Sequence, residues 1–376
     1  MCPAERFNLA EVNRLHAPRA GRQQGFVMLA VIWVLLAMLA GVALFSHWVQ
    51  VSLQHAHTRQ ETINAHIGAH TAMNTALYIR LTGQRSVYGV SVPSEAGAEQ
   101  DILSLFEFDD LGALIIDHDK ASQNENLALD QQVWQYGGLN FVVQDTAGLI
   151  GLTEFSHQAL VRNLLRHGRT HARAQQLIDS YLDYRDADNQ RRLSGAEAFD
   201  YRLQERAEPL NGALRSPLQL RDVMYWDQVL EPWSNGELLY RLKVAGGASV
   251  NVNSASPEVL EWVLDDGALA RQIFEQRRIE PYTNVFGLEA LIDDETIALT
   301  IEPDEGLRFW WWEQGSPSAW VHEFHYDALT AGRAALRQDW VLRVDVPPSL
   351  KRQSPRKVTW RLLPEFPDYL GRRRGD

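Results

Sequence analysis

The chain has 376 residues, of which 45% are hydrophobic and 22% charged, values typical of a folded protein with one large or two modest cores. Its net charge of −12 argues against a nucleic-acid-binding protein, which needs a basic face. The single cysteine, Cys2, excludes a disulfide framework and a cysteine-based metal site.

The N-terminal segment predicts a membrane anchor. Residues 1–25 are polar, with four arginines and two glutamates, and residues 26–46 form an uncharged apolar run long enough to span a bilayer. The arginines before the run predict a cytoplasmic N-terminus, with the rest of the chain on the far side of the membrane. A cleaved signal peptide fits less well. The apolar core of a signal peptide is shorter than this run and is followed by a small-residue cleavage site, which does not follow cleanly here. An ordinary signal anchor fits the hydropathy equally well.

The junction between the basic leader and the apolar run is Gly25-Phe26. It resembles a prepilin processing site, where cleavage after the glycine leaves a phenylalanine that becomes N-methylated. In most pilins the fifth mature residue is a glutamate, but here that position is Ala30. A carboxylate in the membrane needs a cationic partner, which in pilins is the N-terminal amine of a neighbouring subunit. In a subunit with no neighbour above it, such a carboxylate would be left unpaired in the membrane.

The helical pattern continues beyond the apolar run. Residues 52–82 contain no proline, and large apolar residues recur every three or four positions. We therefore predict one helix over 26–81, about 85 Å long, whose outer half packs on a sheet. The proposed apolar stripe consists of Leu53, Ala56, Ile63, Ile67, Met73, Leu77 and Leu81.

Strand and helix patterns in the remaining chain predict an α+β fold. Alternating apolar residues in 139–144, 339–346 and 357–363, and the aromatic run 309–312, predict antiparallel strands with one buried face. Between these groups, helical periodicity and Ser-Pro starts indicate a largely helical insert over 156–300. Its predicted helices lie within 157–168, 170–184, 216–233, 256–264 and 267–278.

Several segments in and just before the insert resemble the K-type (GspK-like) minor pseudopilins of type II secretion systems, in the same order. They are VVQDTAGLIGL (142–152), YLDYRDADNQRRLSGAEAFDY (181–201), SPLQLRDVMYWDQVLEPW (216–233) and SVNVNSASPEVL (249–260). The missing glutamate at Ala30 matches that family as well. The chain departs from it in its long leader and in residues 90–132.

This resemblance implies a pilin-like fold: a long N-terminal helix packed on an antiparallel sheet that carries a large inserted helical domain. The expected parts are a leader (1–25), a transmembrane helix (26–46), a stalk helix with the first strands (47–155), the insert (156–300) and the returning strands (301–376). The resemblance also implies that the chain is a non-enzymatic subunit of the bacterial inner membrane, with a periplasmic domain, at the tip of the pseudopilus. The implied partners are the minor pseudopilins I and J, the major pseudopilin and prepilin peptidase.

One acidic loop has the spacing of a calcium site. Asp186, Asp188, Gln190, Arg192, Ser194 and Glu197 occupy positions 1, 3, 5, 7, 9 and 12 of an EF-hand loop, but Arg191 replaces the glycine at position 6. A regular EF-hand is therefore not expected. K-type pseudopilins bind calcium, and the resemblance carries this property to Asp186, Asp188 and Glu197, with Asp183 and Asp200 as weaker candidates.

Two other functions remain open at this stage. A membrane-anchored periplasmic enzyme lacks support, because the sequence has no P-loop and no G-x-S-x-G elbow, and His322-Glu323-Phe324-His325 does not have the H-E-x-x-H spacing. His66 and His70 have that spacing without an evident third ligand. A DNA-binding pilin-like protein is the other alternative, because residues 249–260 resemble the start of a helix-hairpin-helix module, although the region is acidic.

Overall fold

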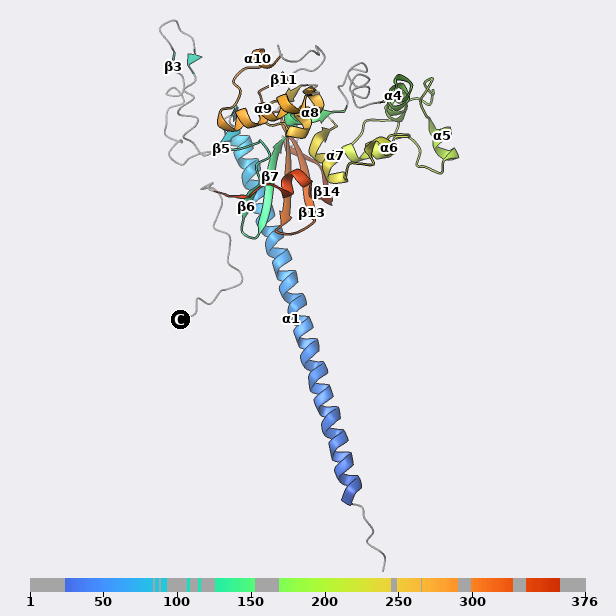
Figure 1. Ribbon diagram of the computed structural model, residues 1–376, viewed down its shortest axis with the longest axis vertical. Coiled ribbons are helices and arrows are strands. Elements are labelled where there is room, and N and C mark those ends of the chain that lie inside the picture. The colour runs from blue at the N-terminus through green and yellow to red at the C-terminus, as the bar shows by residue number, and fades with distance from the viewer. Residues whose placement is uncertain are drawn as a thin grey trace, which may run out of the picture. The chain divides into compact units, whose positions relative to one another are not determined.

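The computed structural model describes residues 24–83, 85–87, 89–92, 107–108, 114–115, 126–152, 169–244, 249–264, 266–289, 299–326 and 336–358. The chain divides into two compact units, Met1–Ile63 and Asn64–Asp376. Helix α1 (Gln24–Thr82) runs from the first unit into the second (Figure 1). This confirms the continuous helix predicted over 26–81.

The buried face of α1 differs from the predicted stripe. Within the second unit, α1 contacts the sheet through Ala69, Ala72 and Ala76, which are at most 1% exposed, and through Met73 and Leu77. Of the other predicted stripe residues, Leu53, Ile63, Ile67 and Leu81 are exposed. The predicted face was chosen from the positions of large apolar residues. The buried face is instead rich in alanine, because small side chains let the helix backbone come close to the sheet.

The main sheet has six strands in the order β14-β13-β12-β7-β6-β15 (Figure 1). The predicted strands at 139–144, 309–312 and 339–346 are confirmed as β7, β12 and β14. The sheet is mixed, because β15 pairs with β6 in parallel, so the expectation of a purely antiparallel sheet is wrong. Most of the predicted strand 357–363 lies outside the described residues. The strands are β6 (Trp134–Tyr136), β7 (Leu139–Asp145), β12 (Gly306–Glu313), β13 (Ser318–Tyr326), β14 (Leu336–Asp345) and β15 (Arg356–Lys357).

Both faces of the central strands are covered. Alternate residues of β12, such as Phe309, belong to the core shared with α1, and the residues between them, such as Trp310, pack with Leu239 and Tyr240 on the opposite face. Every residue of β7 is buried. The prediction of one buried face is therefore wrong for β7 and β12, because helices cover both sides of the sheet.

The described residues between β7 and β12 contain several helices and two pairs of short strands. The predicted helices at 170–184, 256–264 and 267–278 are confirmed as α4, α8 and α9, whereas 216–233 forms only two short helices, η4 and α6. The predicted helix 157–168 lies outside the described residues. The helices are η3 (Thr146–Gly148), α4 (His171–Arg185), α5 (Ala198–Leu203), η4 (Pro217–Arg221), α6 (Asp227–Leu230), α7 (Asn235–Arg241), α8 (Pro257–Leu264), α9 (Gly267–Ile279) and α10 (Phe286–Glu289), with α11 (Pro348–Lys351) after β14.

Serine caps explain where two of these helices begin. The hydroxyl of Ser216 accepts a hydrogen bond from Leu218 N, and that of Ser256 accepts one from Val259 N. Each serine precedes a proline, which has no N–H to satisfy in the first turn. The two Ser-Pro starts predicted from the sequence are therefore confirmed.

Short strands in sheets of two or three complete the described structure, and β1, β2 and β5 form the three-stranded one. Two of these sheets lie in the helical segment: β8 pairs in parallel with β9, and β10 with β11. These strands are β1 (Arg85–Ser86), β2 (Gly89–Ser91), β3 (Glu107–Phe108), β4 (Leu114–Ile115), β5 (Asn126–Leu127), β8 (Ile150–Gly151), β9 (Leu242–Lys243), β10 (Val250–Asn251) and β11 (Leu299–Thr300).

Candidate functional site

The predicted processing residues lie in the first turn of α1. Gly25 and Phe26 follow Gln24, the first helical residue. The apolar residues from Val27 to Phe45 are exposed, as a membrane-embedded helix requires. Within the described residues, one helix, Val27–Thr82, is long and apolar enough to cross a membrane, judged by length and composition alone. The leader, 1–23, lies outside the described residues.

The acidic loop joins the end of α4 to the start of α5. Asp186 is the C-terminal cap residue of α4, and Glu197 is the N-terminal cap residue of α5. The cap positions hold both carboxyl groups where the two helices meet. Asp188 lies between them and accepts a hydrogen bond from Gln190 N (2.8 Å), which tightens the loop as an Asx turn.

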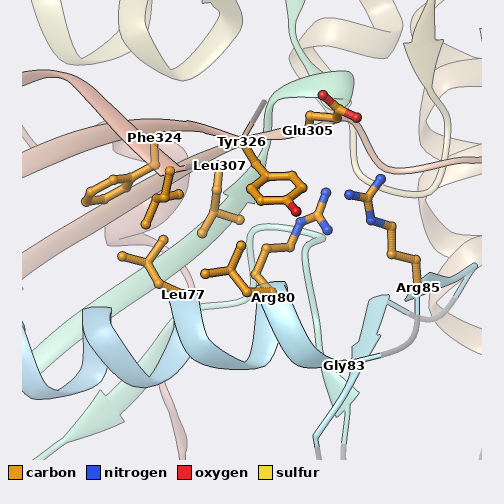
Figure 2. Close-up of a pocket in the computed structure, with 10 residues that line it drawn as sticks. Leu77, Arg80, Gly83, Arg85, Glu305, Leu307, Phe324 and Tyr326 are labelled. Carbon is orange, nitrogen blue, oxygen red and sulfur yellow. The ribbon is translucent and has the colours of Figure 1, made fainter. Parts of the chain in front are cut away.

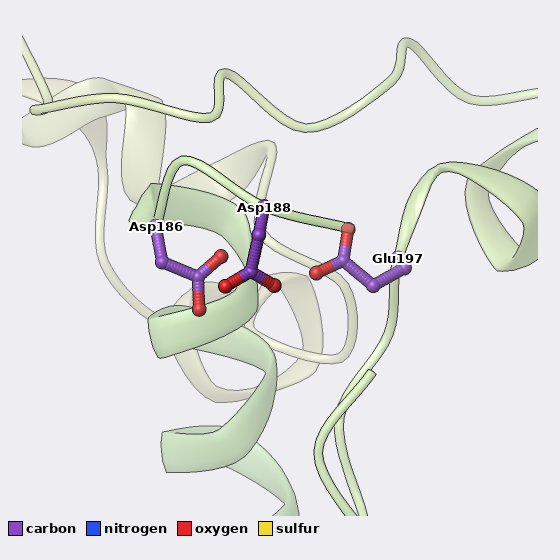
Figure 3. A group of neighbouring side chains, drawn as sticks. All are labelled: Asp186, Asp188 and Glu197. Carbon is purple, nitrogen blue, oxygen red and sulfur yellow. The ribbon is translucent and has the colours of Figure 1, made fainter. Parts of the chain in front are cut away.

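The structure brings the three predicted ligands together. Carboxylate oxygens of Asp186, Asp188 and Glu197 all lie within 4.8 Å of one another, and the side chains converge in Figure 3. Asp186 Oδ1 and both carboxylate oxygens of Glu197 are buried without a hydrogen-bond partner. Burial, with repulsion from Asp183 and Asp186, raises the pKa of Glu197 to about 7. Converging carboxylate oxygens, three of which have no hydrogen-bond donor, form a ligand set that suits a hard cation such as Ca²⁺.

The weaker candidate Asp183 has a structural role. It is fully buried, accepts hydrogen bonds from Arg192 N and Nη1, and shares the Arg192 guanidinium with Asp186. A Cβ at Gly195 would lie 1.9 Å from Asp183 Oδ2, so the loop needs glycine there. Asp200 accepts from the backbone N–H of Glu197 (3.0 Å) and pairs with Arg191.

The sequence analysis missed Asp179. This residue is 5% exposed, and its carboxylate accepts hydrogen bonds from Ser194 N (3.1 Å) and Gln175. Asp179, Asp183 and Asp186 follow one another at steps of four and three on α4, which places them on one helix face. This spacing was the sequence signal that could have identified Asp179. The hydrogen bonds from Ser194 to Asp179 and from Arg192 to Asp183 attach the loop to α4 at two points.

The residues at the spaced positions have different contacts. Asp186, Asp188 and Glu197 bring carboxylate oxygens together. Arg192 directs its guanidinium to Asp183 and Asp186, and Ser194 contributes its backbone N–H to Asp179.

The histidines considered for metal binding pack against aromatic rings. His66 lies edge-on to Trp311, with ring centroids 4.8 Å apart, and His70 lies 6.2 Å from His322. Burial lowers the pKa of His322 to about 4, and His70 contributes to the shift. His66 is half-buried and His322 is buried where the C-terminal part of α1 packs on the sheet, whereas His70 is exposed.

Comparison with known proteins shows distant similarity to solved structures. No family model matches the chain, and no curated protein matches it. Among solved structures, the crystal structure of the GspK-GspI-GspJ complex from the enterotoxigenic Escherichia coli type 2 secretion system is similar, with a TM-score of 0.40 and 16% identity. The match covers 57% of this chain and 82% of that chain. At this distance the similarity does not assign a function.

Proposed function

We propose that this chain is a K-type minor pseudopilin that caps the tip of a periplasmic pseudopilus and supports its assembly for protein export. The observation that carries the proposal is the composition of α1. Its first part is apolar and exposed, and its last turns are buried against a mixed sheet. A helix of this kind serves both as a membrane anchor and as the spine of a pilin-like domain.

Two features favour the tip over the body of a fibre. Ala30 replaces the glutamate that pairs with a neighbouring subunit in most pilins. In addition, the chain between β7 and β12 forms a helical segment with its own core, which includes Leu177, Val223 and Leu260. We propose that this segment is an inserted domain, too bulky to repeat along a fibre. The proposed partners are the minor pseudopilins I and J in the tip complex and the major pseudopilin below it.

The test is the N-terminus of the mature protein. Prepilin peptidase is expected to cut the full-length chain after Gly25 and leave an N-methylated Phe26. Intact mass spectrometry of the chain, expressed with and without the peptidase, measures this directly. The Gly25→Ala variant is expected to remain uncut, whereas the matched control Gly21→Ala, four residues upstream, is cut normally.

An uncut chain in the presence of active peptidase, or a cut beyond residue 46, would refute the pseudopilin assignment. A signal anchor would stay uncut, and an exported protein would be cut after the apolar run. If the cut falls after Gly25, co-purification with I-type and J-type subunits tests the subunit type. Failure to bind either subunit would refute the tip assignment.

We also propose that Asp186, Asp188 and Glu197 hold a calcium ion that fastens the loop between α4 and α5. The unpartnered oxygens of Asp186 and Glu197 support this proposal. The ion would offset the repulsion among these carboxylates. Ca²⁺ takes six to eight oxygen ligands, so backbone carbonyls or waters would complete its coordination.

Calcium is expected to stabilise the protein. At a concentration 100 times the Kd, binding contributes about 2.7 kcal/mol, which corresponds to a rise in the thermal midpoint of roughly 5 °C. Glu197→Gln is expected to remove this rise, and to stabilise the metal-free protein because it removes one repelling charge. Thermal unfolding in EGTA and in Ca²⁺ measures both effects. Glu302→Gln, an exposed change elsewhere, is the control. An equal calcium response in Glu197→Gln would refute the site.

A further inference from the structure

A small cavity lies at the end of α1, within the unit Asn64–Asp376. It has a volume of about 90 Å³, enough for a few non-hydrogen atoms. One wall is apolar and consists of Leu77, Leu307, Phe324 and Leu336. The opposite side carries Arg80, Arg85, Glu305 and the ring of Tyr326, as Figure 2 shows. The cavity therefore joins an apolar wall to a polar rim with two arginines.

Arg80 is a buried cation that forms no direct ion pair with any residue that the structure describes. Its side chain is 6% exposed, its Nη2 donates to the backbone oxygen of Asp304, and its Nε is buried without a partner. Burial and the nearby Arg85 lower the pKa of the Arg80 guanidinium, and the neighbouring Asp145, Asp304 and Glu305 oppose this shift. A buried charge without an opposite charge is costly, so the cavity is electrostatically prepared for an anion.

The carboxylates around Arg80 are engaged elsewhere. Asp145 accepts four hydrogen bonds from other groups. Asp304 pairs with Lys243 (3.0 Å) and accepts from Thr146. In the described part of the chain, neither Arg80 nor Arg85 forms an ion pair. Only the exposed Glu305 leaves a carboxylate at the rim.

The charges and the shape together select the ligand. Two guanidinium groups directed at one space offer the forked donors that a carboxylate accepts (Figure 2). Glu305 at the rim disfavours a second negative charge on the ligand. Carbon atoms attached to the anion would gain apolar contacts with the wall around Leu77 and Phe324. Inorganic phosphate has no such carbon atoms.

We propose that the Arg80–Arg85 cavity binds a single peptide carboxylate carried on a short hydrocarbon chain. The source is either a glutamate side chain or a terminal α-carboxylate next to an apolar residue. The inference does not depend on the proposed function, because it uses only the geometry of the cavity.

The test uses the full chain in detergent micelles and pairs of probes that differ by one charge. N-acetylglutamate α-amide and N-acetylvaline carry the two kinds of carboxylate, and N-acetylglutamine amide and N-acetylvalinamide are their neutral counterparts. Saturation-transfer NMR measures binding of each probe. Carboxylates are expected to bind in the millimolar range and the neutral amides not to bind. The tighter carboxylate identifies the source.

Variants connect binding to the cavity. Arg85→Gln is expected to weaken carboxylate binding roughly three- to five-fold, the effect of one partly exposed charge pair. Arg85 is exposed, so this change leaves the fold intact, and the exposed Arg271→Gln on α9 is the matched control. Equal binding of carboxylates and amides, binding of inorganic phosphate at least as tight, or unchanged binding in Arg85→Gln would each overturn the proposal.

Discussion

Replacing Asp145 with alanine is expected to lower the free energy of unfolding by about 3–5 kcal/mol. Asp145 ends β7 and is 1% exposed. Its Oδ1 accepts hydrogen bonds from the backbone N–H groups of Ala147 and Asp304, and its Oδ2 accepts from Asn251 and Ser254. Alanine leaves three buried donors and the part-buried N–H of Asp304 without this acceptor. Each buried loss costs about 1–3 kcal/mol, although the losses do not add fully. Thermal and denaturant unfolding followed by tryptophan fluorescence measures the change.

The charge of Asp145 gives this prediction a pH signature. Burial raises its pKa from 3.8 to about 6, against the effect of its hydrogen bonds. Because the folded-state pKa is the higher one, ionised Asp145 destabilises the fold above pH 6, by at most about 3 kcal/mol, and this cost is relieved as the pH falls from 6 toward 3.8. Asp145→Asn stays neutral and is expected to lose this part of the pH dependence. An identical pH profile for Asp145→Asn and the unchanged protein would contradict the assignment.

Arg308→Met is expected to destabilise the protein by about 3–5 kcal/mol. Arg308 on β12 is fully buried and pairs with Glu323 across the strand, with Nε 2.8 Å from Oε2. Its Nη1 donates to the backbone oxygens of Leu239 and Leu242, and the guanidinium lies over the ring of Trp340. Methionine keeps much of the volume but leaves Glu323 as a partly buried charge without its Arg308 partner.

A double-mutant cycle tests the pair. Glu323→Leu alone leaves the Arg308 charge uncompensated and is expected to cost a similar amount. Arg308→Met with Glu323→Leu removes both charges, so its loss is expected to be smaller than the sum of the single losses by about 1–3 kcal/mol. The measurement is equilibrium unfolding of all four proteins. Strict additivity would show that the two side chains act independently.

The elements that the sequence predicted well have strong local patterns. Apolar periodicity located α1, α4, α8 and α9, and period-two alternation located β7 and β14. The patterns failed where long-range contacts decide the outcome. The parallel pairing of β15 with β6 and the covering of both faces of β7 depend on segments distant in sequence. In the segment 216–233 tertiary contacts interrupt the helical period: Arg221, for example, donates to the backbone oxygens of Leu230 and Trp233.

At the candidate site, too, local spacing in the sequence predicted some residues, whereas contacts made by folding determined others. Carboxylate spacing identified Asp186, Asp188 and Glu197, which the structure brings within reach of one cation. The roles of Asp179 and Asp183 depend on how the loop folds back on α4, and no spacing rule within the loop contains that information. The cavity at Arg80 was not predicted, because its walls come from α1, β12, β13 and β14, and a single sequence does not show that these elements meet.

The pairing of β7 with β12 has a consequence for folding kinetics. β7 ends at Asp145 and β12 begins at Gly306, so this pairing closes a loop of about 160 residues, at an entropic cost of roughly 4–5 kcal/mol. The β12-β13-β14 meander involves only local contacts and is expected to form early. The two halves of the sheet join only when the helical segment between them is compact enough to bring its ends together. We therefore expect the compaction of that segment to limit the rate at which the sheet is completed.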